Sequence, residues 1–393
     1  MDNVLEKPRD LRILLLGMYF VVVFCSLFQP IQTGLQLLLF LTLLILYADR
    51  IKFRTIIGVI IITGVNVLSY FIGENFSFGF WDPINFLMKY IAVFQVFVLY
   101  DIFISLTDRQ KIKILNLVFI SITITNLLSI YYNILDPLAI RYRPEQYLFV
   151  INFNQFYALP ILVSAIFSKI LFQKKINLLL TVTFLSSIIV LLIGSLVTGL
   201  VLGTLSCSLV FILWATKSSR FKQIITLFFI GASTLLIRFP LASIIRKIAN
   251  SDIFSSLTSA KLLVAAGLLE GEEATSTLDV RNEYKQAALN SFKEKPLFGI
   301  PYSEYRFGTI SSHADWYDIL AMNGIVGITA LIIVFTDFCR KVFISIENET
   351  DLISFSISLI IFITLGFLNP NFAISILITT FLISPNITLD YNY

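Results

Sequence analysis

Apolar runs about as long as a membrane-spanning helix dominate the chain. A spanning helix needs about 20 mostly apolar residues, and twelve runs bounded by charged residues, Pro or Gly fit this length. The stretch 176–215 is uncharged and too long for one span, so we divide it at the glycines between 194 and 199. The predicted spans are 11–28, 31–48, 55–73, 83–104, 112–134, 148–168, 176–196, 198–216, 222–239, 317–338, 352–368 and 370–385.

One polar region interrupts this pattern between the ninth and tenth spans, at 241–316. Helical apolar spacing over 241–249 and 259–269 predicts two helices, and 279–292 fits an amphipathic helix opened by Asp279 as its cap. A loop of this length among otherwise short connections is typical of a functional or disordered segment. Its helical pattern favours an ordered, functional one.

Composition supports a membrane protein. Of the 393 residues, 57% are hydrophobic and 14% charged, against about 25% charged residues in an average soluble domain. We therefore predict an all-α, polytopic membrane protein of about 12 transmembrane helices. Its parts are spans 1–9 within 1–240, a helical extracytoplasmic loop at 241–316, and spans 10–12 with a C-terminal tail at 317–393.

The cations predict the orientation, because cytoplasmic loops of membrane proteins are enriched in Lys and Arg. A cytoplasmic N-terminus places three cations at each of five inner loops or ends and two at a sixth, against Arg141 and Arg143 in the short outer loops. We expect the first span to be retained, since no small-residue cleavage site follows it. The inner cations are Lys7, Arg9, Arg12, Arg50, Lys52, Arg54, Arg109, Lys111, Lys113, Lys169, Lys174, Lys175, Lys217, Arg220, Lys222, Arg340 and Lys341.

Rare residue types restrict the chemistry. The three cysteines, Cys25, Cys207 and Cys339, are far apart, which argues against a disulfide framework or a zinc site. The single histidine, His313, excludes a multi-histidine metal centre, and the dispersed net charge of +4 excludes a nucleic-acid binder. Any reaction would use Arg, Lys, carboxylates and that imidazole.

The segment that leads into the tenth span contains the first candidate site. Ser312 is a suitable helix cap with Asp315 three residues later, as in a capping box, which would place His313 in the first helical turn at the outer surface. Helix N-termini attract anions, and an imidazole can accept a proton there. The alternative is that Asp315 is only a cap and His313 an interfacial side chain.

Two pairs of cations are candidate anion ligands. Arg281 and Lys285 lie four residues apart on one helical face, an arrangement that repels unless an anion lies between them. Arg141 and Arg143 run against the positive-inside bias, and guanidinium groups bind phosphate through two parallel hydrogen bonds. The alternatives are solvated side chains for the first pair and lipid headgroup contact for the second.

Other polar residues in or near the spans have weaker functional arguments. Arg238 lies near the outer end of a span, where it could extend to the surface, and Arg306 lies between two aromatic residues. Either could contact a ligand. Asn66, Asn116 and Asn126 lie within spans and are expected to form hydrogen bonds between helices.

These residues resemble the C-terminal signature of the bacterial O-antigen polymerase and ligase family. The matching elements are Arg281, Pro296 with Gly299, Ser312-His313 and Gly324-x-x-Gly327. The resemblance covers about 50 residues and extends to the layout of a dozen spans with a large outer loop before the tenth. The chain departs from many relatives at Ala314, where they have Asn.

The resemblance implies a membrane glycosyltransferase of the GT-C-like type. It would polymerise undecaprenyl diphosphate-linked oligosaccharide units at the outer face of the bacterial cytoplasmic membrane, without a metal or other cofactor. We expect inversion of the anomeric configuration, because the acceptor would attack opposite the departing diphosphate in a single displacement. His313 would act on the acceptor hydroxyl, and Arg281, Arg141 and Arg143 would bind the diphosphate. Remaining ligand contacts are expected from Lys285, Arg306 and Arg238.

The expected partners are the lipid-linked donor and acceptor, the bilayer, a chain-length regulator and a flippase, with no nucleic acid. Two alternatives stay open. A ligase would transfer the glycan from its lipid carrier to another acceptor, such as lipopolysaccharide. We favour the polymerase because the Ile-, Asn-, Lys- and Phe-rich composition is typical of low-GC genomes, and Gram-positive bacteria, which lack lipopolysaccharide, are common among these. A saccharide-lipid transporter would show internal repeats and mid-membrane ionisable residues, which are not evident in the sequence.

Overall fold

The computed structural model shows an all-helical protein in the residues that it describes. These are 7–72, 90–136, 139–142, 147, 149–174, 177–194, 196–216, 242–251, 259–260, 262–263, 266–267, 276–300, 314–369 and 371–389. Every regular element in these ranges is a helix, which confirms the predicted all-α class. A short helix over 242–249 and the helical turns between 259 and 267 agree with the two helices predicted for the polar region.

Most helices are long and apolar. They are α1 (Lys7–Phe24), α2 (Gln32–Leu46) after a 3-10 segment (Ser26–Ile31), α3 (Phe53–Ile72), α5 (Ile91–Ile104), α6 (Asp108–Leu135), α7 (Ala139–Tyr142), α8 (Phe153–Gln173), α9 (Leu178–Ile193), α10 (Val197–Ala215), α13 (Ser276–Glu294), α14 (Asp315–Ser345), α15 (Glu349–Leu368) and α16 (Ile374–Ile378). A π-helical turn, Thr379–Ile383, and a 3-10 turn, Ser384–Asn386, follow α16.

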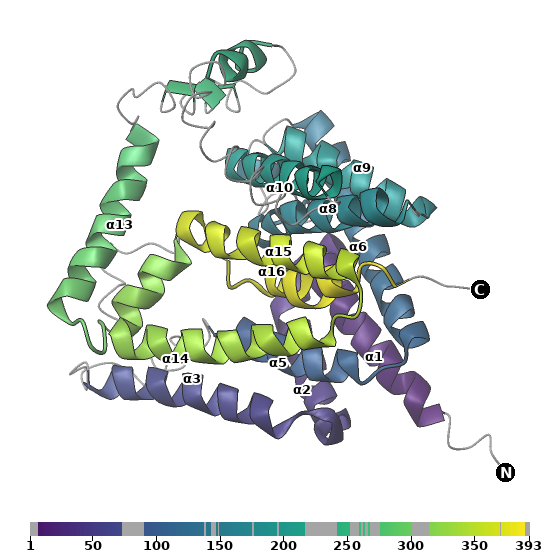
Figure 1. The fold of residues 1–393 in the computed structure, drawn as a ribbon, viewed down its shortest axis with the longest axis vertical. Helices are drawn as coiled ribbons and strands as arrows, with labels where there is room; N and C mark the ends of the chain where they lie inside the picture. Colours follow the sequence, from purple (N-terminus) through teal and green to yellow (C-terminus); the bar gives the residue numbers. More distant parts are fainter. Residues whose placement is uncertain are drawn as a thin grey trace.

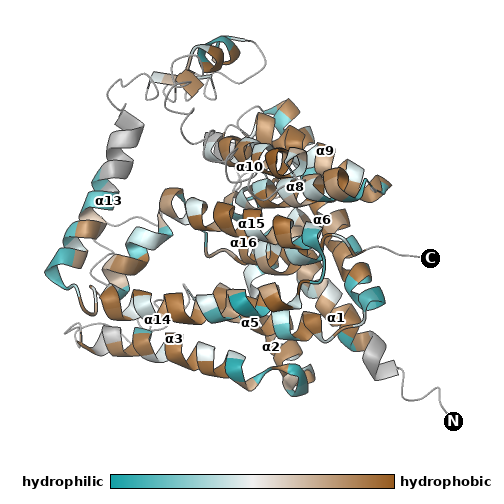
Figure 2. Cartoon of the chain, viewed as in Figure 1, coloured by the Kyte–Doolittle hydropathy of each residue, from teal (hydrophilic) through white to brown (hydrophobic). Residues whose placement is uncertain are grey.

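These helices make the chain a membrane-embedded protein. Eleven of the twelve predicted spans coincide with described helical segments, and the remaining one, the ninth at 222–239, lies outside the described residues. Six of the segments are long and apolar enough to cross a membrane, and five more are shorter apolar helices. Large apolar side chains stay exposed on the outside of the bundle, for example Ile45 and Leu178, and apolar residues cover much of the helix surfaces (Figure 2).

Capping residues explain why some helix boundaries differ from the predicted ones. The helix predicted over 112–134 begins already at Asp108, because Thr107 forms a capping box with the first turn of α6. The helix predicted from 148 begins at Phe153, because the Asn152 side chain accepts a hydrogen bond from the Gln155 backbone N–H at 2.9 Å. Hydrophobicity alone does not mark these polar starts.

The predicted division of the run 176–215 is confirmed as the break between α9 and α10. The turn fits closely around the ring of Phe156 on α8. A Cβ added at Gly194 or Gly199 would overlap that ring. Glycine at both positions therefore lets the two helices turn tightly over α8.

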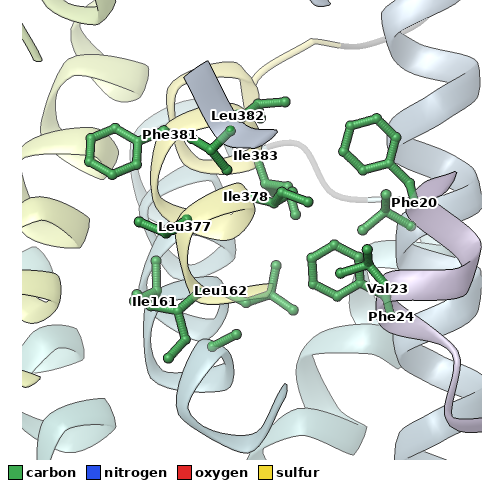
Figure 3. Packing of buried hydrophobic residues seen from close by; sticks show 14 of the residues in the cluster. Phe20, Val23, Phe24, Ile161, Leu162, Leu377, Ile378, Phe381, Leu382 and Ile383 are labelled. Atoms are coloured by element: carbon green, nitrogen blue, oxygen red, sulfur yellow. The ribbon is translucent and has the colours of Figure 1, made fainter. Parts of the chain in front are cut away.

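The core lies where the first and last helices of the chain meet α8. Figure 3 shows the rings and aliphatic side chains of α1, α8, α16 and the π-helical turn packed together. All of these residues are buried. The labelled members are Phe20, Val23, Phe24, Ile161, Leu162, Leu377, Ile378, Phe381, Leu382 and Ile383.

Two further arrangements place the candidate site. In Figure 1, α3 lies beside α14 along most of its length, and α13 extends away from the bundle after meeting α14 near one end. The helices α8, α9 and α10 stack on another side of the bundle. The amphipathic helix predicted over 279–292 is therefore present as α13, and it reaches back to the helix that begins after His313. It begins at Ser276, so the prediction of Asp279 as its cap is wrong.

Candidate functional site

The candidate site is built around a break inside α14. Gly324 has φ +60° and ψ −165°, values that no helical residue adopts, so α14 consists of a short part before Gly324 and a long part after it. This backbone region is almost restricted to glycine. The break leaves backbone N–H and C=O groups that need partners from elsewhere in the chain.

The segment 296–300, directly after α13, supplies those partners. The Ile325 N–H donates to the Pro296 carbonyl at 2.8 Å, and the Ile300 N–H donates to the Ala321 carbonyl at 2.8 Å. A third bond of this kind joins Val326 N–H to the Leu297 carbonyl at 3.1 Å. The connection after α13 is thus docked into the helix break by main-chain hydrogen bonds.

Glycine is required on both sides of this contact. Gly299 has φ +74°, and a Cβ added there would overlap the backbone of Met322. A Cβ at Gly324 would overlap the backbone of Leu297, and one at Gly327 would overlap the Asn323 side chain. The structure therefore brings together the Pro-Gly and Gly-x-x-Gly elements that were singled out in the sequence.

A second contact joins α13 to the first turn of α14. The Lys285 ammonium lies over the Tyr317 ring, 5.7 Å from its centroid. Arg281 lies one helical turn earlier on α13, and Tyr317 lies four residues after His313 in the chain. The predicted pair Arg281 and Lys285 is thus carried by a helix that meets the start of α14.

The other predicted site residues are described only in part. Four of them, Arg143, Arg238, Arg306 and His313, lie outside the described residues. The side chains of Arg141 and Arg281 also lie outside the description, although their backbones lie on α7 and α13. Helix α7 packs against α6.

The start of α14 corrects the predicted cap. The helix begins at Asp315 with Ala314 as N-cap, so the capping box predicted from Ser312, with His313 in the first turn, is wrong. The Asp315 carboxylate has different partners: it accepts hydrogen bonds from the backbone N–H groups of Asn371 at 2.7 Å and Phe372 at 3.0 Å. Because this buried carboxylate is needed by the chain between α15 and α16, it does not act as a local cap.

That irregular connection between α15 and α16 is itself buried and polar. The Tyr157 hydroxyl donates to the Asn369 side-chain carbonyl at 3.1 Å, and the Asn371 amide donates to the Phe362 carbonyl at 2.9 Å. Of the five buried side-chain atoms without a hydrogen-bond partner in the described part of the chain, three lie in or beside this connection: Asn369 Nδ2, Asn371 Oδ1 and Ser375 Oγ. Buried polar groups are rarely left unpaired, so this end of the bundle offers donors and acceptors to water or a ligand.

Amide side chains connect neighbouring helices at the same end. Asn323, next to the break, donates from Nδ2 to Asn66 Oδ1 on α3, and its Oδ1 accepts from the Tyr90 hydroxyl at 2.7 Å. Elsewhere in the bundle, Asn126 Nδ2 donates to Ser186 at 3.2 Å and to Ser187 at 3.0 Å. The predicted interhelical role is confirmed for Asn66 and Asn126.

Comparison with known proteins adds nothing to this geometry: no family model, no curated protein and no solved structure matches the chain. Within the described ranges, His, Cys, Asp and Glu form no group of three or more that could hold a metal ion. The arrangement therefore has to be interpreted from its own residues.

Sequence reasoning missed the polar residues that surround the break. Tyr90, Asn323, Asn369 and Asn371 gather with Asp315 at one end of the bundle. A signal for them was present, because amides and a carboxylate inside apolar runs are costly in a membrane and usually face the protein interior. Their mutual proximity, however, depends on the packing of helices far apart in the sequence.

Proposed function

We propose that the protein polymerises oligosaccharide units carried on a polyprenyl diphosphate, as the resemblance of its C-terminal region implies. In this proposal twelve spans cross the cytoplasmic membrane of a bacterium, with the N-terminus inside and the polar region 241–316 outside. The end of the bundle that contains the α14 break then faces outwards. The opposite end contains the cations Lys52, Arg54 and Lys341, which agrees with the positive-inside rule.

The junction of α13 and α14 is the observation that carries this proposal. The Lys285–Tyr317 contact and the main-chain bonds between 296–300 and the Gly324 break hold the helix of Arg281 against the helix that follows His313. The cation that stabilises the leaving diphosphate and the base that accepts the hydroxyl proton have to lie in one site, because both act at the same anomeric carbon. Arg281 belongs to one of the two joined helices, and His313 precedes the other helix by two residues in the sequence.

The proposed reaction is a single displacement at the anomeric carbon. The acceptor hydroxyl oxygen forms the new bond to that carbon, and its proton passes to His313, whose imidazole is partly neutral near pH 7. The bond between the carbon and the diphosphate oxygen breaks, and its electron pair leaves with the lipid diphosphate. Arg281, Arg141 and Arg143 stabilise the leaving charge, while Lys285, Arg306 and Arg238 contact the diphosphate or glycan. The product has inverted configuration.

Polymerisation is tested with the purified protein in detergent and a polyprenyl diphosphate-linked repeat unit, without nucleotide or added metal. We expect a ladder of longer glycans on a gel. A single transfer to a foreign acceptor would instead identify a ligase. Absence of product, with uptake of the lipid-linked saccharide into proteoliposomes, would identify a transporter.

The absence of a metal requirement is tested in the same assay. Activity should survive EDTA, because the proposed groups that neutralise the diphosphate are arginines. Loss of activity that one divalent cation restores would refute the arginine-only account.

Orientation is tested by cysteine labelling in intact cells. In a variant without the three native cysteines, Gly271→Cys should react with an impermeant maleimide, and Ser218→Cys should react only after lysis. The reverse pattern would place the α13–α14 junction on the inner side and exclude the proposed site of reaction.

A further inference from the structure

A pocket lies between α3 and α14 at the end of the bundle opposite the break. Its volume is about 390 Å³. Close approach of the two helices at Gly58, where an added Cβ would lie 3.1 Å from Val334, forms part of its floor. Three cations and three isoleucines are among the residues that line it: Lys52, Arg54, Lys341, Ile57, Ile61 and Ile333.

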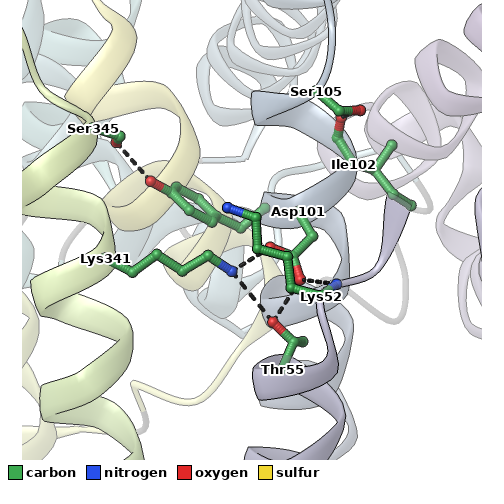
Figure 4. A network of polar contacts seen from close by, with 8 residues as sticks. Lys52, Thr55, Asp101, Ile102, Ser105, Lys341 and Ser345 are labelled. Atoms are coloured by element: carbon green, nitrogen blue, oxygen red, sulfur yellow. Dashed lines mark hydrogen bonds and ion pairs between the residues drawn. The ribbon is translucent and has the colours of Figure 1, made fainter. Parts of the chain in front are cut away.

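One of the cations that line this pocket, Lys341, is balanced by a buried carboxylate behind the lining. Asp101 of α5 is fully buried and accepts hydrogen bonds from the Lys52 backbone N–H at 3.0 Å and the Thr55 hydroxyl at 2.5 Å (Figure 4). Lys341 of α14 forms an ion pair with the same carboxylate and donates to Thr55 at 3.2 Å. The Lys341 charge is therefore already neutralised.

The mouth of the pocket has a surplus of positive charge. Arg54 pairs with Asp337, but both side chains are substantially exposed, and such a pair contributes little to stability. The Lys52 ammonium makes no hydrogen bond or ion pair within the described part of the chain; only its backbone N–H and C=O are engaged. The three cations Lys52, Arg54 and Lys341 face two carboxylates, Asp101 and Asp337, so one positive charge is not neutralised. The Arg54 guanidinium also has N–H groups that its ion pair does not use.

The remaining wall is apolar and faces outwards from the bundle. Three aliphatic side chains on this wall are exposed on membrane-embedded helices, where they would face lipid. The exposed fractions are 38% for Ile57, 40% for Ile61 and 60% for Ile333. A pocket with cations at one end and exposed aliphatic side chains along its length matches an amphiphile with an anionic head. A free anion would use only the first part, and a neutral lipid only the second.

We propose that this pocket binds an anionic phospholipid, whose headgroup phosphate contacts Lys52 and Arg54 and whose acyl chain follows Ile57, Ile61 and Ile333. Basic pockets between membrane helices are suited to such headgroups. The site lies at the end of the bundle opposite the proposed glycosyl transfer and does not depend on that function. Binding can therefore succeed or fail independently of polymerase activity.

Lipid binding is measured by native mass spectrometry of the purified full-length protein with phosphatidylglycerol, with phosphatidylcholine and with inorganic phosphate. We expect phosphatidylglycerol to bind at least about tenfold more tightly than phosphatidylcholine, given about 1 kcal/mol for each basic residue at a membrane surface. Equal affinity for both lipids would overturn the proposal. Displacement of the lipid by millimolar phosphate would reduce the site to an anion site and also refute it.

Variants test whether the selectivity comes from this pocket. The double variant Lys52→Gln/Arg54→Gln should lose about tenfold in phosphatidylglycerol affinity, while Arg109→Gln, an exposed cation outside the pocket, should lose none. The Asp101 contacts survive in the double variant, because Lys52 engages Asp101 through its backbone. Equal losses in both variants would point to nonspecific charge attraction and overturn the assignment.

A third variant separates ligand binding from a structural role of the Arg54–Asp337 pair. Asp337→Asn removes the competing carboxylate, so we expect phosphatidylglycerol affinity to rise about threefold. If the pair only held α3 against α14, the same change would lower the affinity, and that outcome would refute the proposed headgroup contact.

Discussion

The two ends of the α3–α14 helix pair are joined by different chemistry. At the end near the break, neutral amides meet: Asn323 of α14 donates to Asn66 of α3. At the opposite end a charged network joins the same helices, with Lys341 of α14 bonded to Thr55 of α3 and to Asp101 of α5. The helices run antiparallel, so these contacts fix both ends of one interface.

The buried networks at the two ends differ in how completely their polar groups are paired. At the charged end, the buried Asp101 carboxylate has three hydrogen-bond partners, and both of its oxygens are engaged. The amide end contains a broken helix, a docked loop and buried atoms of Asn369, Asn371 and Ser375 without partners. Saturated networks hold a structure in place, while open donors and acceptors can bind something else. Four predictions test this contrast.

The largest effect is expected from His313→Ala, which should lower polymerase turnover by about a hundred- to ten-thousand-fold, as is typical for loss of a general base. Donor binding and thermal stability should stay close to wild type, and the residual rate should no longer vary with pH near neutrality. Arg281→Ala should weaken donor binding as well, with only partial rescue by Arg281→Lys, which lacks the bidentate fork. Near wild-type polymer from His313→Ala would return that histidine to an interfacial role.

The next effect concerns the break itself. Gly324→Ala should lower the free energy of unfolding by about 3 kcal/mol, since a side chain at this φ and ψ is strained and would overlap Leu297. Gly64→Ala on α3 is the matched control, because an added Cβ there has no atom within 4 Å. Thermal unfolding in detergent measures both. Equal melting temperatures for the two variants would mean that the docked loop is not held as described.

At the charged end, Asp101→Asn should destabilise the protein by about 2 kcal/mol, because Lys341 then lacks its counter-ion in a largely buried position. The double variant Asp101→Asn/Lys341→Met should recover part of this loss. Thermal unfolding again measures the effect, and glycan assembly per folded molecule should not change. A fall in that specific activity would show that the charged end also takes part in the reaction.

The smallest effect is expected from Asn66→Ala, at about 1 kcal/mol or less, since interhelical hydrogen bonds in membranes contribute modestly. Asn116→Ala serves as control, because the Asn116 side chain makes no hydrogen bond within the described part of the chain. The comparison uses the unfolding midpoint of each variant. A loss of unfolding free energy several-fold larger than this for Asn66→Ala would show that the amide end, too, mainly stabilises the fold.

Hydrophobic run length was enough to predict most of the fold. It located eleven described helical segments and separated α9 from α10. It failed where a polar residue sets the boundary, as at Asp108 and Asp315, because caps depend on specific side-chain geometry. Asp315, three residues after Ser312, suggested a capping box. Its carboxylate instead accepts a hydrogen bond from the backbone N–H of Asn371, which is distant in the sequence.

The candidate site was predictable only as a set of residue types. The spacing of Gly324 and Gly327 marked them as a motif, but nothing local indicates that Pro296 and Gly299 would dock on them. The network around Asp101 was also missed, because its members come from three helices. Such contacts between distant segments leave no periodic signal in one sequence.

The break in α14 also constrains the order in which the protein is made. During synthesis the segment 296–300 precedes α14, so the partners for the open amides of Ile325 and Val326 are already outside the ribosome when the break emerges. In hydrocarbon each unpaired backbone group costs several kcal/mol. We therefore expect correct assembly of α14 to require docking of a segment from the preceding polar region, before the last two predicted spans are made.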